Sequence, residues 1–564
     1  MGTRKLLWCA ALLVSLLAAQ STQAPALSDA DKAKNQAKIQ GKVVNLVAGE
    51  PVRKANLSLR GLAGGPALTA TADNEGKFII ESIDPGRYIL SADRQGFVKD
   101  AYGAKRSGAM GTVLELKAAQ TMSDLVFKLT PQGVIAGHVL DDEGEPLAGV
   151  MVQALQYQYF SGKKRLIPTG NPLVQTNDLG EFRAPNLAPG RYYIGTSSQR
   201  LTDLTQAVTG EQAKNKEGFV PTFYPSAAEP SAATAVDVAP GAEIAGINLR
   251  MVKARVYRVS GKLMNAVTGA PMNNGMLMVY RREQGGMSTL PTSMHMVQND
   301  KGTFDLKNIP PGPYLVMGMS TNPQDIMITM STLDVGDKDV ENMVITLGSG
   351  VDVTVTAKME NPPAKDVDLS GIRVTLRMDD NPMASLATTQ LGKELKSVMK
   401  RVNPDKYDMT VAGLPANTYV KAAKYADQNV FESGIDVRPG AAATLELTIA
   451  APSGDMSTVV RNEKGDPAAG AVVTLVPQDP KRRTDLFRNT TADQNGMARV
   501  TGIVPGEYLA YAWEDIENGA AEDPDFVKPF ASRGVKVKFS EGSKESVTLT
   551  TISREAVDAE KAKH

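Results

Sequence analysis

Short runs in which apolar and polar residues alternate recur along most of the chain. Val150 and Val152 share one face of such a run, as do Leu57 and Leu59, because successive side chains of a strand point to opposite faces. Gly-x-Pro turns precede these runs, for example at 144–146. No window keeps the 3.6-residue stripe of an amphipathic helix. The pattern predicts an all-β protein made of antiparallel Ig-like or transthyretin-like β-sandwiches.

A longer pattern recurs along the chain. It consists of an acidic or Asn-containing turn that ends in Gly, an apolar residue two positions on, and then Pro-Gly-x-Tyr. The step from the turn Gly to the Pro is nine residues in each copy, for example 85 − 76. Self-similarity of this kind indicates a tandem array. The repeat positions are Gly76, Pro85, Gly86 and Tyr88; Gly180, Pro189, Gly190 and Tyr192; Gly302, Pro311, Gly312 and Tyr314; and Gly496, Pro505, Gly506 and Tyr508.

A further copy is weaker. The segment 414–419 fits the Pro-Gly-x-Tyr frame, with Asn417 in the place of Gly. Asn tolerates a positive φ better than most residues. We expect the motif to be structural in every copy. Its Gly should need a positive φ or a tight turn, and its Tyr should anchor the next strand to the core.

The copies define an expected domain organisation. We expect a signal peptide at 1–26, a linker at 27–38 and a polar tail at 552–564. About five sandwiches lie between them, an ordinary count for a chain of this length at roughly 100 residues each. The junctions are short, which favours an elongated, rod-like arrangement. The expected sandwiches are 39–131, 132–252 (with long loops), 253–349 (rich in Met), 350–451 (the degenerate repeat) and 452–551.

The start of the chain indicates export. Arg4 and Lys5 precede an apolar run from Leu6 to Ala19, which has the length of a signal-peptide core and is too short for a membrane span. No later run is long and apolar enough to span a membrane helically. The only cysteine, Cys9, lies in this run. We therefore expect a mature chain without thiols in the periplasm, at the cell surface or outside the cell.

Charge narrows the range of partners. The 62 basic and 62 acidic residues cancel, whereas proteins that bind nucleic acid are usually basic. The balance therefore argues against nucleic acid as a partner. Gly and Pro, at 50 and 33 residues, fit a folded protein with many turns.

The repeat residues resemble a known family. The order Gly-x-Val, Gly-x-Pro, Asp-x-x-Gly-x-Phe and Ile-x-Pro-Gly-x-Tyr is similar to that of the carboxypeptidase regulatory-like domain. The resemblance covers most of residues 39–551 and implies a transthyretin-like sandwich, also grouped with carbohydrate-binding-like folds. Such domains accompany peptidases, surface adhesins and outer-membrane transporters, so the resemblance specifies the fold more closely than the function.

The sequence offers few of the residues that catalytic and metal sites usually need. The chain has three histidines, His138, His295 and His564, and none has the spacing of a zinc-peptidase site. No Gly-x-Ser-x-Gly elbow and no mature cysteine are present. The acidic run 141–145 favours a solvated hairpin turn over a calcium site. We therefore expect no catalytic residue, no metal and no cofactor.

Methionine is concentrated in and just before the third copy, because 13 of 24 lie between Met251 and Met343. Two interpretations stay open. On a strand, Met-x-Met places both side chains on one face, and Met fills irregular cores well. A cluster such as Met294-His295-Met296, which lies in an otherwise polar segment, also offers soft ligands for Cu(I).

The second copy carries the candidate ligand-binding residues. Its Gly137 stands 124 residues before Gly261, against 96 from Gly41 to Gly137. The additional residues fall within 157–174 and 199–222, and insertions in a sandwich form recognition loops. If both insertions lie at the same end of the sandwich, their aromatic residues would form a surface rimmed by basic residues. Alternatively, the aromatic residues belong to the strand core and a basic loop follows them. The candidates are Tyr157, Tyr159, Phe160, Lys163, Lys164, Arg165, Phe219, Phe223 and Tyr224.

These observations favour a non-catalytic, exported protein that acts as an adhesion, scaffold or ligand-presenting module of the cell envelope. The alternative is a carbohydrate-binding protein that serves polysaccharide uptake or degradation. An enzyme with an unrecognised site is the weakest hypothesis. The expected partner is a glycan or another envelope protein.

Overall fold

The structure is a computed structural model of the chain. It describes residues 35–160, 162–170, 174–200, 217–283, 286–322, 327–348, 350–360, 368–378, 386–438 and 444–561. The expected signal peptide and residues 27–34 of the expected linker lie outside these ranges, as do residues 201–216 of the second copy's insertion. Within the described ranges, no helix is long and apolar enough to cross a membrane.

Five groups of strands follow one another, each around its own buried apolar cluster; we call them sandwiches 1 to 5. Sandwich 1 contains β1 (Ala37–Asn45), β2 (Asn56–Gly61), β3 (Leu68–Thr71), β4 (Lys77–Ile83), β5 (Gly86–Asp93), β6 (Asp100–Ala101), β7 (Leu114–Leu116) and β8 (Thr121–Leu129). Sandwich 2 contains β9 (Gly133–Leu140), β10 (Val150–Phe160), β11 (Lys163–Pro168), β12 (Val174–Gln175), β13 (Glu181–Leu187), β14 (Gly190–Arg200), β15 (Glu217–Phe219), β16 (Thr222–Phe223), the 3-10 helix η3 (Pro230–Ala232), β17 (Val236–Val238), β18 (Glu243–Ile244), β19 (Leu249–Arg250) and β20 (Lys253–Arg255).

The remaining sandwiches are built in the same way. Sandwich 3 contains β21 (Tyr257–Asn265), β22 (Gly275–Glu283), β23 (Gly286–Val297), β24 (Thr303–Ile309), β25 (Gly312–Ser320), β26 (Ile328–Val335) and β27 (Val340–Leu347). Sandwich 4 contains β28 (Val351–Glu360), β29 (Arg373–Met378), β30 (Leu386–Gln390), β31 (Lys396–Val402), β32 (Asp405–Ala412), β33 (Tyr419–Tyr425), β34 (Gln428–Asn429), α2 (Val430–Ser433), β35 (Ile435–Val437) and β36 (Thr444–Ala450). Sandwich 5 contains β37 (Gly454–Arg461), β38 (Val472–Pro477), η4 (Thr484–Leu486), β39 (Arg488–Thr491), β40 (Met497–Ile503), β41 (Gly506–Trp513), η5 (Ala520–Glu522), α3 (Pro524–Val527), η6 (Lys528–Arg533), β42 (Val535–Phe539), β43 (Lys544–Ile552) and α4 (Arg554–Lys561).

The all-β, tandem-sandwich prediction is confirmed, with one addition to the expected antiparallel pairing. The first strand of each sandwich pairs antiparallel with the strand after the repeat turn and parallel with the closing strand. In sandwich 1, β1 pairs antiparallel with β4 and parallel with β8. The same parallel pairing joins β9 to β18 and β19, β21 to β27, β28 to β36, and β37 to β43. The second sheet of sandwich 1 has the order β3-β2-β5-β6.

The turn Gly of the repeat packs against the first strand so closely that no side chain fits. Gly76 has a φ of +73°, and a Cβ there would lie 2.5 Å from the carbonyl oxygen of Val43. The Val43 N–H donates to the Gly76 carbonyl at 2.7 Å, which holds the turn on β1. The other three turn glycines have the same positive φ and the same close approach to a first-strand carbonyl: Gly180, Gly302 and Gly496.

The repeat Tyr is held by its hydroxyl. In every copy the phenol donates to the carbonyl oxygen four residues earlier, so the ring fixes the turn that precedes its own strand. The pairs are Tyr88 to Asp84 at 2.7 Å, Tyr192 to Ala188 at 2.6 Å, Tyr314 to Pro310 at 2.8 Å and Tyr508 to Val504 at 2.8 Å. The Gly two residues earlier has a positive φ at Gly190 and Gly312 only. At Gly86 and Gly506 a Cβ would instead lie 3.4 Å from the ring of the repeat Tyr.

The fourth copy differs from the expected alignment. Tyr407 makes the repeat bond, because its hydroxyl donates to the Asn403 carbonyl at 2.8 Å. Tyr419 instead bonds through its hydroxyl to Glu541 Oε1 of sandwich 5 at 3.0 Å. The alignment on 414–419 is therefore wrong. That segment leads from β32 into β33, a strand that pairs with β36.

The turn position of the fourth copy carries a residue with a side chain. Leu395 stands nine residues before Pro404 (404 − 395) and has a φ of +54°. The Ala357 N–H donates to the Leu395 carbonyl at 2.9 Å, the same bond that the turn glycines make. The backbone of the repeat is thus kept in sandwich 4 although its sequence signature is lost.

The end of the chain holds a helix where a polar tail is expected. Helix α4 places Val557, 1% exposed, in an apolar cluster with Trp513, Phe526 and Phe530. Most of this cluster comes from the segment between β41 and β42, which contains η5, α3 and η6.

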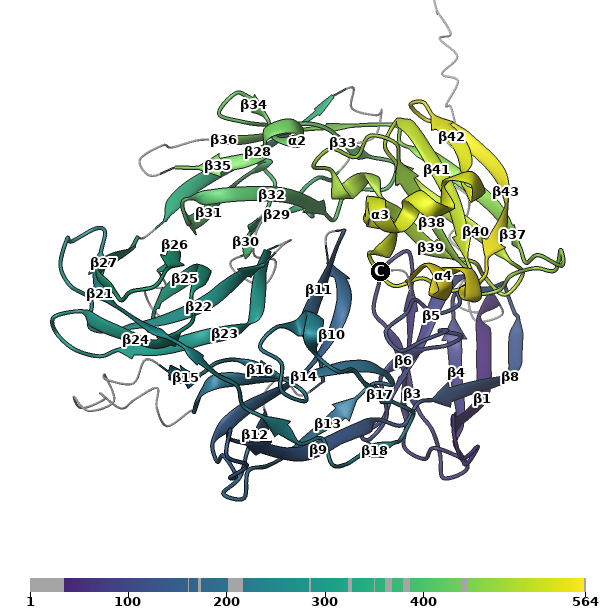
Figure 1. Cartoon of the computed structure of the whole chain (residues 1–564). Helices are drawn as coiled ribbons and strands as arrows, with labels where there is room; N and C mark the ends of the chain where they lie inside the picture. The colour runs from purple at the N-terminus through teal and green to yellow at the C-terminus, as the bar shows by residue number, and fades with distance from the viewer. Residues whose placement is uncertain are drawn as a thin grey trace, which may run out of the picture.

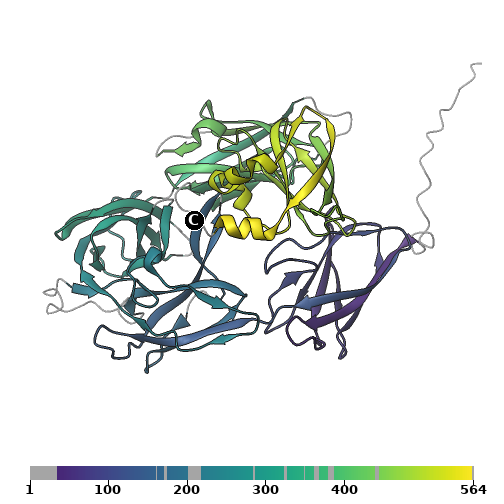
Figure 2. The same cartoon turned by 45° about the vertical axis from the view of Figure 1, so that its right-hand side comes forward.

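The five sandwiches form a closed ring rather than the rod expected from the short junctions. Sandwich 5, yellow in Figure 1, lies beside sandwich 1, purple, and Figure 2 shows the same contact from another side. Thr491 Oγ1 donates to the Gly111 carbonyl at 2.8 Å, and Asn518 Nδ2 donates to the Gly108 carbonyl at 3.0 Å. Loop 102–113 of sandwich 1 is therefore hydrogen-bonded to a part of the chain almost four hundred residues later, and these bonds close the ring.

Candidate functional site

The first insertion of the second copy extends a hairpin instead of forming a loop. Strands β10 and β11 pair from Leu155–Pro168 to Phe160–Lys163, and the tip of the hairpin reaches two other sandwiches. The Tyr159 ring lies 5.7 Å from the Phe526 ring of sandwich 5. The Arg377 guanidinium of sandwich 4 lies 4.7 Å from the centre of the Phe160 ring. These two aromatics join sandwiches together. Burial, with Glu517 and Asp523 nearby, raises the pKa of Tyr159 to about 12.

Part of the hairpin remains open to solvent. Tyr157 is 36% exposed and packs edge-on against Tyr193 at 5.3 Å. The Lys164 ammonium lies 5.5 Å from the centre of the Tyr157 ring. Lys163 is exposed and Arg165 is half-buried on the same strand. This group, which we call the Tyr157 patch, keeps the aromatic and basic character expected of a recognition surface.

The second group of candidate aromatics packs inward instead of adding to the exposed surface. Phe223 is 5% exposed and packs with Leu155 and with Leu290 of sandwich 3. Tyr224 packs against the core of sandwich 2, and the Lys253 ammonium lies 5.3 Å from the centre of the Phe219 ring. Phe223 adds no open ring surface to the Tyr157 patch, because it is buried at the junction between sandwiches 2 and 3. Tyr193, the neighbour of Tyr157, packs against the cluster that contains Phe223.

The other candidate groups have structural surroundings. Asp141 Oδ1 accepts hydrogen bonds from the N–H groups of Glu143 and Glu145 at 2.9 and 2.8 Å, as expected of a solvated turn. His138 Nδ1 lies 3.2 Å from Asn248 Oδ1. Among the residues that the structure describes, no group of three or more His, Cys, Asp or Glu side chains could hold a metal ion.

Nine methionines of sandwich 3 fall into two groups. Met272 and Met327 belong to the buried core. Seven others are half-buried on the sheet that contains β22, β23, β25 and β26, and they lie outside that core cluster. These are Met276, Met278, Met294, Met296, Met317, Met319 and Met330.

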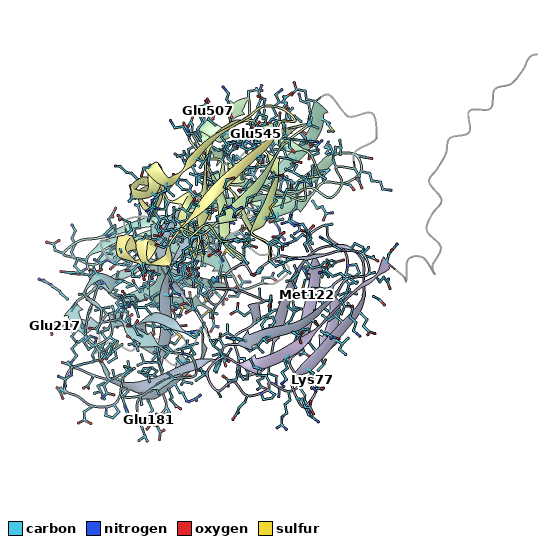
Figure 3. All side chains as sticks on the ribbon, turned by 90° about the vertical axis from the view of Figure 1, so that its right-hand side faces the viewer. Lys77, Met122, Glu181, Glu217, Glu507 and Glu545 are labelled. Carbon is cyan, nitrogen blue, oxygen red and sulfur yellow. The ribbon has the colours of Figure 1, made fainter. Side chains whose placement is uncertain are left out.

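A larger site lies at the closure of the ring. A cavity of about 930 Å³ is bounded by sandwiches 1, 2 and 5; we call it the seam cavity. Tyr102, Phe127 and Met122 give it apolar walls, and Lys105 and Lys128 are exposed at it. Figure 3 labels Met122 on the side of sandwich 1 nearer sandwich 5, and Lys77 further away. Sequence reasoning missed this cavity because its walls come from three copies of the repeat.

Polar contacts also join sandwich 1 to sandwich 5 beside the cavity, along a contact that we call the seam. The Gln494 side chain accepts from the Glu115 N–H at 3.2 Å and donates to the Glu115 carbonyl at 3.1 Å. Next to it, Val113 forms a parallel β-bridge with Asp493. Both Val113 and Asp493 are buried. The seam therefore resembles a short strand pairing, although it joins the first and the last sandwich.

One wall of the cavity comes from a recognised domain. Residues 38–130 match the carboxypeptidase regulatory-like domain. The solved structures similar to this chain include the minor pilin GBS52 of Streptococcus agalactiae, at 14% identity over 39% of this chain and 96% of the pilin, with a TM-score of 0.22. They also include the major pilin subunit BcpA of Bacillus cereus, at 10% identity over 56% and 99% of the two chains, with a TM-score of 0.14. Two B repeat units of the Staphylococcus aureus collagen-binding protein match at 12% identity over 74% and 100%, with a TM-score of 0.12. No curated protein matches the chain.

The carboxypeptidase regulatory-like domain supplies the charged groups with the most altered environments. Asp100 lines the cavity, and its Oδ1 accepts from the Ala101 N–H at 3.0 Å. Burial raises the pKa of Asp100 to about 6, against the opposing effect of the Ala101 and Gly108 N–H groups. Asp100 therefore changes its charge within the range in which most proteins work.

Arg106 of the same domain joins the cavity to sandwich 5. Its Nε lies 3.2 Å from Asp515 Oδ1, and its guanidinium lies 3.9 Å from Glu517 Oε1. The Asp515 side chain is only 10% exposed. Burial lowers the pKa of Arg106, while Asp515 and Glu517 oppose that shift. Arg106 thus compensates buried acid across the seam, and Lys105, Lys128 and Arg554 carry further positive charge along the lining.

Proposed function

We propose that the protein is a non-catalytic, exported scaffold of β-sandwiches that binds a ligand in the seam cavity. The observation that carries this proposal is the cavity itself, which lies where sandwiches 1, 2 and 5 meet. A cavity of about 930 Å³ has the size of sites that enclose much of a small ligand. Export is supported by the basic residues and apolar run within 1–26. The compartment we propose is the periplasm, the cell surface or the exterior.

The lining favours an anionic ligand with an apolar face. The half-buried Tyr102 offers ring surface, and its ring centre lies 6.0 Å from that of the buried Phe127. Lys105 and Lys128 are exposed at the cavity, whereas Asp100 is the only acidic residue among the lining side chains. Protonation of Asp100 makes the site more cationic as the pH falls towards 6. An acidic oligosaccharide or an acidic segment of an envelope protein fits this chemistry.

The test compares ligand binding by a double variant, Lys105→Gln with Lys128→Gln, and by a control variant, Lys77→Gln. Lys105→Gln and Lys128→Gln remove cations from the lining, and Lys77→Gln removes one from the same sandwich outside the lining. Wild-type protein and Lys77→Gln should bind acidic glycans or acidic peptides on an array, and the double variant should lose that binding. Because all three sites are exposed, the melting temperature should not change. Equal binding by the double variant and Lys77→Gln would exclude the seam cavity as the site.

A second candidate function is carbohydrate binding at the Tyr157 patch. An exposed ring beside a lysine is the arrangement that sugar-binding surfaces use. Tyr157→Ala should abolish binding of the protein to a glycan array if this surface is the site. Tyr159→Ala serves as the contrast, because Tyr159 packs on Phe526 and its loss should reduce stability. Retention of glycan binding in Tyr157→Ala would leave the seam cavity as the candidate site.

A further inference from the structure

Seven of the methionines outside the core of sandwich 3 are aligned by the register of one sheet. This sheet has the order β23-β22-β25-β26. Residues paired across neighbouring strands have side chains on the same face. One row runs Met296–Met276–Met319, and the next runs Met294–Met278–Met317–Met330. We call this surface the methionine face.

The opposite face of the same strands carries the aliphatic residues of a usual core. On β22, Leu277 and Val279 alternate with Met276 and Met278 and are fully buried in the core. On β25, Val316 lies next to Met317 and is likewise buried in the core. The thioethers are thus separated from the aliphatic core rather than mixed with it. Packing of the core of sandwich 3 does not account for them.

Packing between sandwiches accounts for only part of the methionine face. Met317 and Met330 contact the core cluster of sandwich 4. The four methionines of β22 and β23 are not part of that cluster or of the core of sandwich 3. They form two directly opposed pairs, Met276 with Met296 and Met278 with Met294.

We propose that Met276, Met278, Met294 and Met296 form a binding site for Cu(I). Thioether sulfur is a soft ligand that prefers Cu(I) to hard divalent ions. Side chains directly opposite on antiparallel strands have Cβ atoms about 4.5–5.5 Å apart. Each Met adds flexible torsions beyond its Cβ, so three or four sulfurs can turn towards one ion.

A neighbouring phenol limits one end of the site. The Tyr280 hydroxyl donates to Met278 Sδ at 3.4 Å, and Tyr280 follows Met278 on the same face of β22. Sulfur keeps a second lone pair when it accepts one hydrogen bond. The phenol therefore orients the Met278 thioether and leaves it able to bind the ion.

The imidazole of His295 does not take part in this site. His295 pairs with Leu277, so it lies on the face opposite to Met294 and Met296. The site is therefore made of thioethers alone and carries no negative charge of its own. Ligands of this kind favour a monovalent soft ion over Zn²⁺ or Cu²⁺.

The experiment measures Cu(I) binding by competition with a chromophoric Cu(I) chelator. The full chain is titrated under nitrogen with Cu(I) supplied as its acetonitrile complex, and with Ag(I) as a redox-inert substitute. Met278→Leu with Met294→Leu removes one opposed pair at nearly constant volume, a change that cores usually tolerate. Met272→Leu, a buried core position of the same sandwich, is the matched control. Thermal unfolding of each variant verifies that it is folded.

We expect wild type and Met272→Leu to bind Cu(I) stoichiometrically. The double variant should bind it about tenfold more weakly or worse, the scale on which loss of a supporting contact affects a metal site. X-ray absorption at the copper edge should show sulfur neighbours without imidazole. Absence of binding by wild type would overturn the proposal. So would full affinity in the folded double variant, or an absorption spectrum with nitrogen ligands.

Discussion

The close approach of the repeat turn to the first strand can be measured with two glycines of sandwich 3. Gly302 has a φ of +62°, and a Cβ there would lie 2.6 Å from the Leu263 carbonyl oxygen. Gly269 has a φ of +68° and no atom within 4 Å of the same position. Gly302→Ala and Gly269→Ala therefore share the backbone strain, and only the first adds a collision with β21.

The structure gives the expected size of each effect. A left-handed conformation costs a residue with a Cβ roughly 1–2 kcal/mol. Overpacking against backbone adds about 1–3 kcal/mol. We expect Gly269→Ala to destabilise sandwich 3 by about 1–2 kcal/mol and Gly302→Ala by about 2–5 kcal/mol. For a sandwich of this size, each kcal/mol lowers the melting temperature by about 4–8 °C.

Two probes separate the local effect from the global one. Hydrogen exchange of β21 and β24 amides reports the stability of sandwich 3. Trp513, fully buried in sandwich 5, reports unfolding of that sandwich by fluorescence, because the other tryptophan, Trp8, lies in the expected signal peptide. Gly302→Ala should lose exchange protection in sandwich 3 and leave the Trp513 transition in place, since each sandwich has its own core. Equal effects of the two variants would refute the collision argument, and a matching shift of the Trp513 transition would refute independent cores.

Three further predictions follow from single contacts. Tyr407→Phe should destabilise sandwich 4 by about 1 kcal/mol, because the Asn403 carbonyl loses the hydrogen bond from the Tyr407 hydroxyl. Tyr425→Phe should leave the stability unchanged, because the buried Tyr425 hydroxyl has no partner among the described residues. Urea unfolding measures both effects. The pKa of Asp100 is raised from 3.8 to about 6 in the folded protein, so folding favours the neutral acid. Sandwich 1 should therefore lose stability as the pH rises from about 4 to 6. Hydrogen exchange measured over a pH series should show this loss in wild type and not in Asp100→Asn. Arg106→Ala leaves the Asp515 carboxylate without its cation and should weaken the seam by about 2 kcal/mol, seen as a larger radius of gyration in small-angle scattering; an unchanged scattering curve would show that the ring does not depend on this pair.

The strand pattern was predictable because it is local. Alternation along β10 or β22 follows from which residues face a core, and each sandwich repeats it. The repeat turn was predictable for the same reason, since its Gly meets a carbonyl of its own sandwich. The fourth copy shows the limit of this reasoning. Leu395 adopts the conformation of Gly in the other copies, so the backbone survived a substitution that removed the sequence signal.

The ring and the seam cavity could not be predicted from local patterns. Gln494 is an ordinary polar residue in a turn, and only the arrangement of five sandwiches places it on Glu115. The same holds for Tyr159, whose exposed-loop appearance in the sequence conceals a contact with Phe526 of another sandwich. Contacts between sandwiches depend on the angle at each junction, and no periodicity of the sequence records that angle.

The parallel pairing of the first and last strands has a mechanical consequence. In sandwich 1, β1 and β8 lie side by side from Lys38–Thr121 to Asn45–Leu129. A pull on the two ends of such a unit draws these strands along each other in opposite directions. All hydrogen bonds between them then share the load at once, instead of opening one after another as in an unzipped hairpin. The ring would open first under tension, and each sandwich would then resist further extension in shear.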